Sequence, residues 1–224
     1  MTPRTLHLIF KTHLDIGFTR QAHEVVEAYL NHYIPAAIAL ARELAADGGR
    51  ERFVWTTGSW LINEALEVYT GERRRVLEQA LGQGHLAWHG LPFTTHTEYL
   101  DASLIRHGLS LSQGLDRRFG RTTIAAKMTD VPGHTVALVP LLAEAGIRFL
   151  HLGVNPASTV PAVPPCFRWQ HAGAEITVMY SGSYGETAVL PGLDHGLAFG
   201  HTGDNHGPQS ATETVNGRGP VAGG

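Results

Sequence analysis

The stretch Thr5-Leu-His-Leu-Ile-Phe-Lys-Thr-His-Leu-Asp-Ile-Gly-Phe18 decides how this chain folds. Its apolar part predicts a buried strand over Thr5–Lys11, which runs into His13-x-Asp15-x-Gly17. Because residues two apart on a strand point to the same side, the imidazole and the carboxylate project together. They do so at the carboxyl end of the strand, where parallel α/β folds place their active sites. Such a pair suits a divalent cation, zinc above all, although two polar residues also end strands by chance.

The composition indicates an intracellular α/β protein. A chain of 224 residues can bury a real core as one domain. Its 17 basic and 20 acidic residues nearly balance, which predicts neither a nucleic-acid nor a membrane partner and leaves the oligomeric state open. The single cysteine, Cys166, excludes an internal disulfide framework. Without a basic-then-apolar start or an apolar run of about 20 residues, we expect a cytoplasmic protein.

Strands alternate with helices along the chain. The hydrophobic periodicity predicts strands over 5–11, 52–57, 85–89, 122–128, 148–153 and 196–201, and helices over 21–46, 71–81, 101–119 and 136–145, with another helix starting at 58–59. Residues 167–170 and 175–180 predict a hairpin around His171-Ala-Gly-Ala. The alternation favours parallel βαβ units, hence a doubly wound sheet or a barrel.

Individual residues predict where these helices begin, bend and end. Pro35 predicts a kink or a break in the first helix. Ser59 and Asp101 are the expected N-caps of their helices. Three glycines, Gly82, Gly120 and Gly146, are the expected helix ends.

The C-terminal sequence differs in character from the rest of the chain. Residues 209–215 begin like a capped helix, and the chain then continues into Asn216-Gly-Arg-Gly-Pro-Val-Ala-Gly-Gly224. A globular domain seldom ends on the first turn of a helix. We therefore expect one domain over 1–210 and an irregular tail over 211–224, as in a fragment of a longer protein or an altered reading frame.

A second polar site follows the fourth predicted strand, in Lys127-Met-Thr-Asp130-Val-Pro-Gly-His134-Thr135. Asp130 lies just past the strand, and His134 opens the next helix, whose N-terminal amides favour anions. In a parallel sheet, Asp130 faces the same rim as His13 and Asp15. One histidine and two aspartates leave coordination positions of a metal open for substrate oxygens. The alternative is that Asp130 only caps the helix and His134 lies on the surface.

These motifs together resemble the N-terminal catalytic domain of glycoside hydrolase family 38, the α-mannosidases. The family's Ser-His-x-Asp-x-Gly-Trp is matched by residues 12–18, and its Asp-Pro-Phe-Gly-His-Ser by residues 130–135. A Gly-x-Trp segment between them is matched by residues 58–60. Order and strand context make the combination more specific than any single motif, and the similarity covers roughly residues 5–210.

The resemblance implies a parallel (β/α) barrel of the glycoside hydrolase and deacetylase type, incomplete in this chain. It also implies a zinc-dependent retaining hydrolase that acts on a carbohydrate substrate, an α-mannoside or a related glycoside. His13, Asp15 and Asp130 would bind zinc, and Asp130 would also be the nucleophile. Asp204, in a Gly-Asp-Asn-His segment that also suits a simple turn, would be the acid/base. The expected sugar contacts are Phe18, Trp60 and His134.

The chain also departs from the family pattern. Phe18 replaces the usual tryptophan, and Val131-Pro132 replaces Pro-Phe. The family's fourth zinc ligand is a histidine beyond residue 224, so we expect an incomplete metal site unless His201 or His206 substitutes.

Two other functions fit the same residues. A carbohydrate deacetylase would use Asp130 only as a metal ligand, and a metal-bound water would attack an amide. A non-catalytic sugar-binding remnant would bind zinc without turning over a glycoside or an acetylated sugar.

Overall fold

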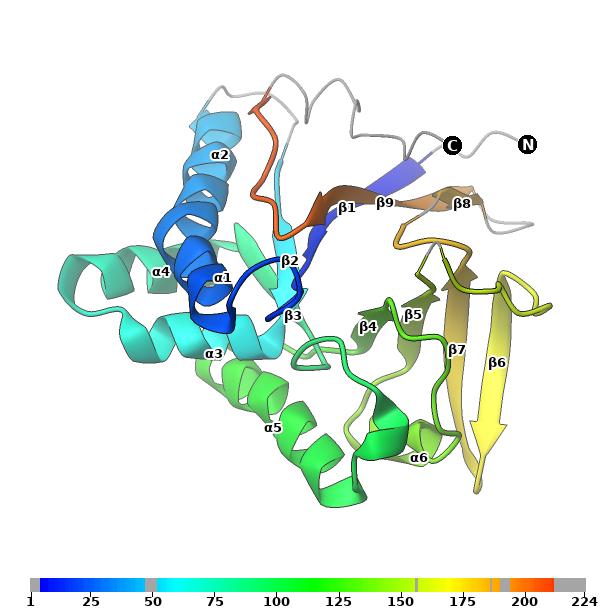
Figure 1. The fold of residues 1–224 in the computed structure, drawn as a ribbon. Helices are drawn as coiled ribbons and strands as arrows, with labels where there is room; N and C mark the ends of the chain where they lie inside the picture. The colour runs from blue at the N-terminus through cyan, green and yellow to red at the C-terminus, as the bar shows by residue number, and fades with distance from the viewer. Residues whose placement is uncertain (1–4, 47–51, 156, 186, 190–193, 212–224) are drawn as a thin grey trace.

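The computed structural model describes residues 5–46, 52–155, 157–185, 187–189 and 194–211. It has two mainly parallel β-sheets with helices packed on their outer sides (Figure 1). The first sheet has the order β3-β2-β1-β9-β8. Its strands are β1 (Thr5–His13), β2 (Trp55–Gly58), β3 (Leu86–His89), β8 (Thr187–Val189) and β9 (His195–Asp204). All of its pairs are parallel except β8–β9.

The second sheet has the order β4-β5-β7-β6. Its strands are β4 (Ala125–Thr129), β5 (Phe149–Gly153), β6 (Cys166–His171) and β7 (Ala174–Ser181). The predicted hairpin is confirmed as the antiparallel β6–β7 pair, whose turn residues Ala172 and Gly173 both have positive φ, as a tight hairpin turn requires. The short strand β8 was not predicted from the sequence.

The α/β class with mainly parallel strands is confirmed. The two sheets meet where the backbone N–H of Gly90, just after β3, donates to the carbonyl of Ala125 on β4 at 2.9 Å. In the described part of the chain the sheets do not close into a complete barrel. The expected barrel is therefore only partly present. The described chain has its parallel βαβ units and two sheets that face each other.

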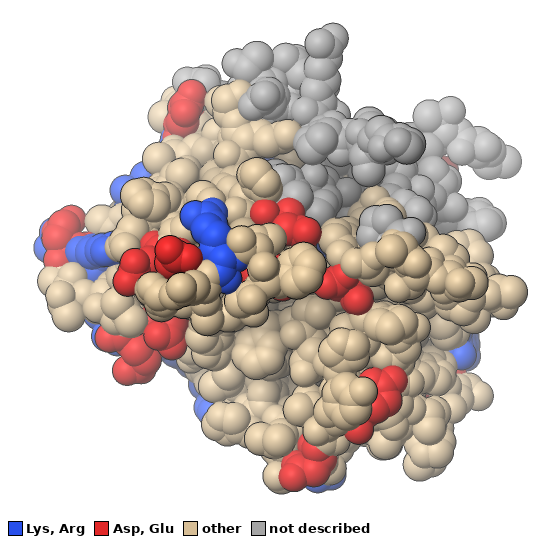
Figure 2. All heavy atoms as spheres, viewed as in Figure 1, with Lys and Arg blue, Asp and Glu red and all other residues tan. Residues whose placement is uncertain are grey.

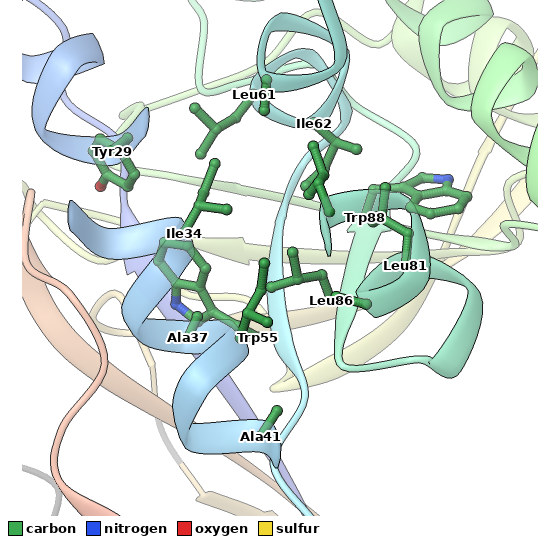
Figure 3. Packing of buried hydrophobic residues seen from close by; sticks show 14 of the residues in the cluster. Tyr29, Ile34, Ala37, Ala41, Trp55, Leu61, Ile62, Leu81, Leu86 and Trp88 are labelled. Atoms are coloured by element: carbon green, nitrogen blue, oxygen red, sulfur yellow. The ribbon is translucent and has the colours of Figure 1, made fainter. Parts of the chain in front are cut away.

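Helices α1 to α4 build the larger core against β1, β2 and β3. They are α1 (Ala22–Ala28), α2 (Ile34–Ala46), α3 (Ser59–Val68) and α4 (Gly71–Gln83). Figure 3 shows Trp55 and Leu86, from the outer face of the sheet, among Ile34, Leu61 and other apolar side chains of these helices. Burial of this apolar surface stabilises the sheet on its outer side at roughly 25 cal/mol per Å².

Helices α5 (Ala102–Phe119) and α6 (Leu138–Glu144) cover the second sheet. Asp101 caps α5 as predicted, because its carboxylate accepts the N–H of Leu104 at 2.9 Å. Gly120 ends α5 with φ +64. Gly146 follows α6 with φ +84. Both predicted stop signals are confirmed by this left-handed backbone, which favours glycine.

The predicted break in the first helix is confirmed, and a π-helical turn accompanies it. Residues Tyr29–Tyr33 form this wider turn between α1 and α2, and Pro35 is the second residue of α2. Such turns interrupt the α-helical hydrogen-bond ladder and redirect the helix axis. Tyr29, which begins this turn, and Ile34, which follows it, are both fully buried.

Several predicted boundaries are wrong. The strand predicted over 122–128 starts at Ala125, and the helix predicted over 136–145, which His134 was expected to open, spans only Leu138–Glu144. Three other differences have a clear physical cause. The second strand starts at Trp55 rather than at residue 52, because its pairing with β3 begins where Trp55 lies opposite Leu86. Helix α4 runs through Gly82 and ends at Gly84, whose φ of +80 lets its N–H reach the carbonyls of Ala80 and Leu81. The N-cap of α3 is Gly58, and the Ser59 hydroxyl donates to the carbonyl of Leu91 instead.

The expected tail over 211–224 lies outside the described residues except for Ala211, which packs against the larger core. None of the helices in the described ranges has the length and apolar content needed to cross a membrane. Figure 2 shows acidic and basic side chains interspersed on one face, without an extended patch of one sign among the coloured residues.

Opposite the helices, the strands present polar side chains toward each other. Phe10 on β1, and Ala126 and Met128 on β4, point into the helix-covered cores, so the residues alternating with them point inward. We call this surface the inner face; its polar residues include Lys11, His13, His89, Lys127, Thr129, His151 and Ser181. A polar inner face next to apolar outer faces places the chemistry of this fold between the two sheets.

The close approach of β2 to the loop after β3 makes Gly58 a test of the fold. A Cβ atom at this position would lie 2.0 Å from the carbonyl oxygen of Pro92, so Gly58→Ala must displace backbone. We expect it to lower the free energy of unfolding by about 1–3 kcal/mol. Gly82→Ala, where nothing lies within 4 Å, should instead stabilise the chain by about 0.5 kcal/mol. Urea unfolding of both variants measures the difference, and equal stabilities would contradict the packing described.

Candidate active site

His13 and Asp130 meet at the carboxyl ends of β1 and β4. The Nε2 atom of His13 lies 3.3 Å from Oδ2 of Asp130, and the His13 side chain is almost completely buried. The two residues come from different sheets, so their contact depends on how the sheets face each other. The prediction that both strand ends share one rim agrees with this contact.

Asp130 has an unusual backbone conformation. Its φ is +79, a left-handed value that costs a side-chain-bearing residue free energy, although aspartate tolerates it better than most. The backbone N–H of Asp130 donates to the carbonyl of Gly153 at 3.0 Å, which continues the β4–β5 pairing by one residue. This conformation turns the carboxylate out of the strand direction, and such strain clusters at functional sites.

Two residues that the sequence did not single out hold one oxygen of Asp130. The hydroxyl of Tyr184 donates to Oδ1, and Nδ2 of Asn155 donates to the same oxygen at 2.8 Å. The Tyr184 ring also stacks on His13, with centroids 4.9 Å apart. Oδ1 is thereby occupied, which leaves Oδ2 as the oxygen that faces His13. No sequence motif marks Tyr184, which lies in the loop after β7; Asn155, just past β5, carries only the general signal of a polar residue after a strand.

A third residue outside the predicted set, Asn205, ties Asp204 to the first strand. Asp204 lies opposite His13 in the β1–β9 register. The backbone N–H of Asn205 donates to the His13 carbonyl at 2.9 Å, and its side-chain amide bonds both the N–H and the carbonyl of Asp15. The same amide donates to Thr19 Oγ1 at 2.7 Å. These hydrogen bonds of Asn205 hold Asp204 and Asp15 close together near Asp130.

The environment shifts the pKa values of the carboxyl groups at this site in opposite directions. Burial alone would raise the pKa of Asp130, but the hydrogen bonds from Tyr184 and Asn155 and the adjacent His13 outweigh it, so the pKa lies below its usual value. Burial and the negative charge of Asp130 raise the pKa of Asp204. Burial and its two aspartate neighbours also raise the pKa of Asp15. The site therefore pairs one readily ionised carboxyl with others that hold a proton more tightly.

His13 is a neutral imidazole at neutral pH. Burial and the nearby charge of Lys127 lower its pKa to about 4, against the opposing effect of Asp130. A neutral imidazole keeps the lone pair that metal binding requires. Its other nitrogen, Nδ1, is buried and has no hydrogen-bond partner among the described residues.

The donor types at this site suit zinc, but the side chains do not form a complete site. His13, Asp15 and Asp130 supply one imidazole and two carboxylates, and Oδ2 of Asp130 already faces Nε2 of His13. Over the described ranges, no group of three histidine, cysteine, aspartate or glutamate side chains is arranged to hold a metal ion. His206 is exposed just past Asp204, and the side chain of His201 lies outside the described residues.

The predicted sugar contacts are dispersed. Phe18 is 84% exposed in the loop after β1. Trp60 packs against the larger core and meets Phe93 edge-on, with centroids 5.8 Å apart. His134 lies 3.3 Å from the hydroxyl of Thr97, in a short helical turn that was not predicted. Burial lowers the pKa of His134 to about 4.

Searches with the sequence find no relatives: neither a protein-family model nor a curated protein matches it. Solved structures do match. An α-mannosidase from Enterococcus faecalis V583 aligns with a TM-score of 0.72 at 12% identity, over 94% of this chain. A glycosyl hydrolase family 38 protein from Enterococcus faecalis aligns with a TM-score of 0.61 at 10% identity, over 96% of this chain. The chain has the fold of one part of these family 38 hydrolase structures.

The family 38 resemblance seen in the motifs is thus confirmed at the level of the fold. A 4-α-glucanotransferase from Thermococcus litoralis also aligns, with a TM-score of 0.54 at 14% identity over 78% of this chain. This chain covers 26%, 25% and 27% of the three structures, so it spans about a quarter of their length.

The buried histidines of the inner face predict acid sensitivity. Burial, Lys127 and Lys11 lower the pKa of His89 to about 3, and burial holds the pKa of His151 well below its usual value. Because the unfolded chain binds these protons below about pH 6.5 and the folded chain does not, stability is complete above that pH and falls as pH decreases. Each such histidine adds at most about 1.4 kcal/mol per pH unit to this slope, a limit approached about one pH unit below 6.5.

Urea unfolding at several pH values measures this slope. We expect a smaller slope for His89→Gln than for the wild-type chain, whereas His107→Gln, at an exposed position of α5, should keep the wild-type slope. An unchanged slope in His89→Gln would show that His89 is protonated in the folded chain.

The hydrogen bond from Tyr184 gives a prediction for the pKa of Asp130. Tyr184→Phe removes a donor that favours the ionised carboxylate, so the pKa of Asp130 should rise. Carboxyl ¹³C NMR during a pH titration follows this residue directly. Tyr180→Phe, on β7, is the matched control and should leave the titration of Asp130 unchanged. A titration of Asp130 that is identical in both variants would contradict the orienting role.

Proposed function

We propose that this chain carries part of the active site of a zinc-dependent retaining glycoside hydrolase that acts on α-mannosides or related glycosides. The observation that supports this most is the Asp130 carboxylate, held by Tyr184 and Asn155 on one oxygen and presented to His13 on the other. Retaining glycosidases need two carboxyl groups roughly 5–5.5 Å apart, one ionised and one protonated. The opposite pKa directions of Asp130 and Asp204 suit that division of roles.

In this proposal Asp130 attacks the anomeric carbon while Asp204 gives its proton to the departing glycosidic oxygen. A covalent glycosyl ester on Asp130 forms as the glycosidic bond breaks. Asp204, now ionised, takes a proton from water, and the resulting hydroxide equivalent releases the sugar with retained configuration. Tyr184 and Asn155 keep the attacking carboxylate in one orientation throughout.

His13, Asp15 and Asp130 would hold the zinc ion. When bound, zinc supplies positive charge beside the carboxylates and open positions for sugar hydroxyls. The neutral state of His13 and the Oδ2 atom of Asp130 that faces it support this assignment. Further ligands would come from outside the described residues.

Metal analysis tests the zinc assignment. After equilibration with zinc and dialysis, His13→Ala and Asp130→Asn should bind zinc at least tenfold more weakly than the wild-type chain, because each loses a ligand. His107→Ala should retain the wild-type metal content. A metal content that neither ligand substitution changes would refute this site.

Kinetics with aryl α-mannosides test the roles of the two carboxyls. Asp130→Asn should lower kcat/KM by about 10³-fold or more, because the nucleophile is lost. Asp204→Asn should lose less activity on a dinitrophenyl mannoside than on a methylumbelliferyl mannoside, because dinitrophenolate leaves without protonation. Equal losses on both substrates would remove Asp204 from the acid role.

A fluorinated glycosyl probe separates this mechanism from deacetylation. Mass spectrometry should find the adduct on Asp130. Acetate release from acetylated sugars without an adduct would instead support the deacetylase, and zinc binding without either reaction would support a sugar-binding remnant.

A further inference from the structure

A hollow of about 240 Å³ lies between α2 and α4, on the side of the first sheet that these helices cover (Figure 1). Its apolar lining comes from Ile34, Ile38 and Ala39 of α2 and from Val76 of α4. None of the described residues that line it belongs to the candidate active site. Ligand sites are typically concave and mainly apolar, with a few polar groups that orient the ligand. The hollow is therefore a candidate ligand site in its own right.

Two arginines supply the polar part of this lining, Arg42 from α2 and Arg73 from α4. Arg42 donates to the side-chain carbonyl of Gln79 at 3.0 Å. The guanidinium of Arg73 lies over the ring of Tyr69, 3.9 Å from its centroid, which is a favourable cation–π contact. These contacts hold both cationic groups beside the apolar lining before any ligand arrives.

The carbonyl of Leu30, in the π-helical turn before α2, explains why Arg73 is fixed there. In an α-helix this carbonyl would accept the N–H of Ile34, but that N–H donates to the carbonyl of Tyr29. The residue after Ile34 is Pro35, which has no N–H to offer. The Leu30 carbonyl instead accepts a hydrogen bond from Arg73. The helix interruption, a feature common at functional sites, thus orients one of the two arginines.

Neither of these two arginines forms an ion pair with a carboxylate of the described ranges. The glutamates of α4 are paired with other arginines, Glu72 with Arg75, and Glu78 with Arg74 and Arg118. A guanidinium group has five N–H donors in a planar fork that matches a carboxylate. The hollow therefore combines an apolar surface with two positive charges that have no acidic partner in this part of the chain.

We propose that this hollow binds a small apolar carboxylate. A cavity of about 150 Å³ holds benzene, so about 240 Å³ has room for a ring and a short arm that ends in a carboxylate. The ring would contact Ile34 and Ile38, and the carboxylate would accept N–H groups of Arg42 or Arg73. The proposal concerns binding alone and does not rest on glycosidase activity.

Ligand-observed NMR with three probes tests this chemistry. The probe 3-phenylpropionate, which has both the ring and the charge, should bind and saturate. Its neutral analogue 3-phenylpropanol should bind about tenfold more weakly or worse, because it cannot form charge-assisted hydrogen bonds. Acetate, which has the charge without the ring, should also bind about tenfold more weakly or worse, because it buries little apolar surface. Equal binding of the alcohol or of acetate would overturn the proposal, as would a failure of 3-phenylpropionate to saturate.

Substitutions locate the binding site. Arg42→Met and Arg73→Met should each weaken binding of 3-phenylpropionate about tenfold, whereas Arg75→Met, at an exposed position of α4, should not. Ala39→Phe leaves both arginines in place and fills the hollow from an exposed position, so it should abolish binding without unfolding the chain. Ala36→Phe, exposed on the same helix outside the lining, is its matched control and should bind as the wild-type chain does. Wild-type affinity in Ala39→Phe, or in both arginine variants, would overturn the assignment.

Discussion

The candidate site depends on the parallel pairing of β1 with β9, two strands from opposite ends of the described chain. This pairing places Asp204 opposite His13, and the Asn205 side chain then fixes the loop that carries Asp15. The positive φ of Asn205 lets its amide reach back to that loop. Asparagine tolerates this conformation and offers both a donor and an acceptor, so one residue satisfies the backbone and sets the distance between two carboxyls.

Around this framework, burial and hydrogen bonding give chemically similar side chains different pKa values. Asp130 and Asp204 have the same chemistry, but only Asp130 receives two hydrogen bonds on one carboxylate oxygen. The helices matter indirectly, because their apolar contacts hold the outer faces of both sheets and leave the polar residues to face each other. The inner face is therefore a region of low solvent access in which a few charges act strongly on one another.

The order of elements was predictable because hydrophobic periodicity and capping residues are local signals, as Asp101 and Gly120 show. The predicted end of α4 at Gly82 is wrong because a glycine can stay in a helix when a later glycine, Gly84, ends it. The contact of His13 with Asp130 followed from strand ends in a parallel fold. Tyr184 and Asn205 were not predictable, since each acts through contacts with residues far away in the sequence. The arrangement of two open sheets also depends on long-range pairing, which no local pattern encodes.

The backbone of Asp130 carries a further consequence for how such a chain changes over time. Glycine would adopt its φ of +79 with less strain, so selection for thermal robustness alone would favour losing the carboxylate. The aspartate at this position therefore lowers the stability of the fold relative to glycine, and in return it places a carboxylate beside His13.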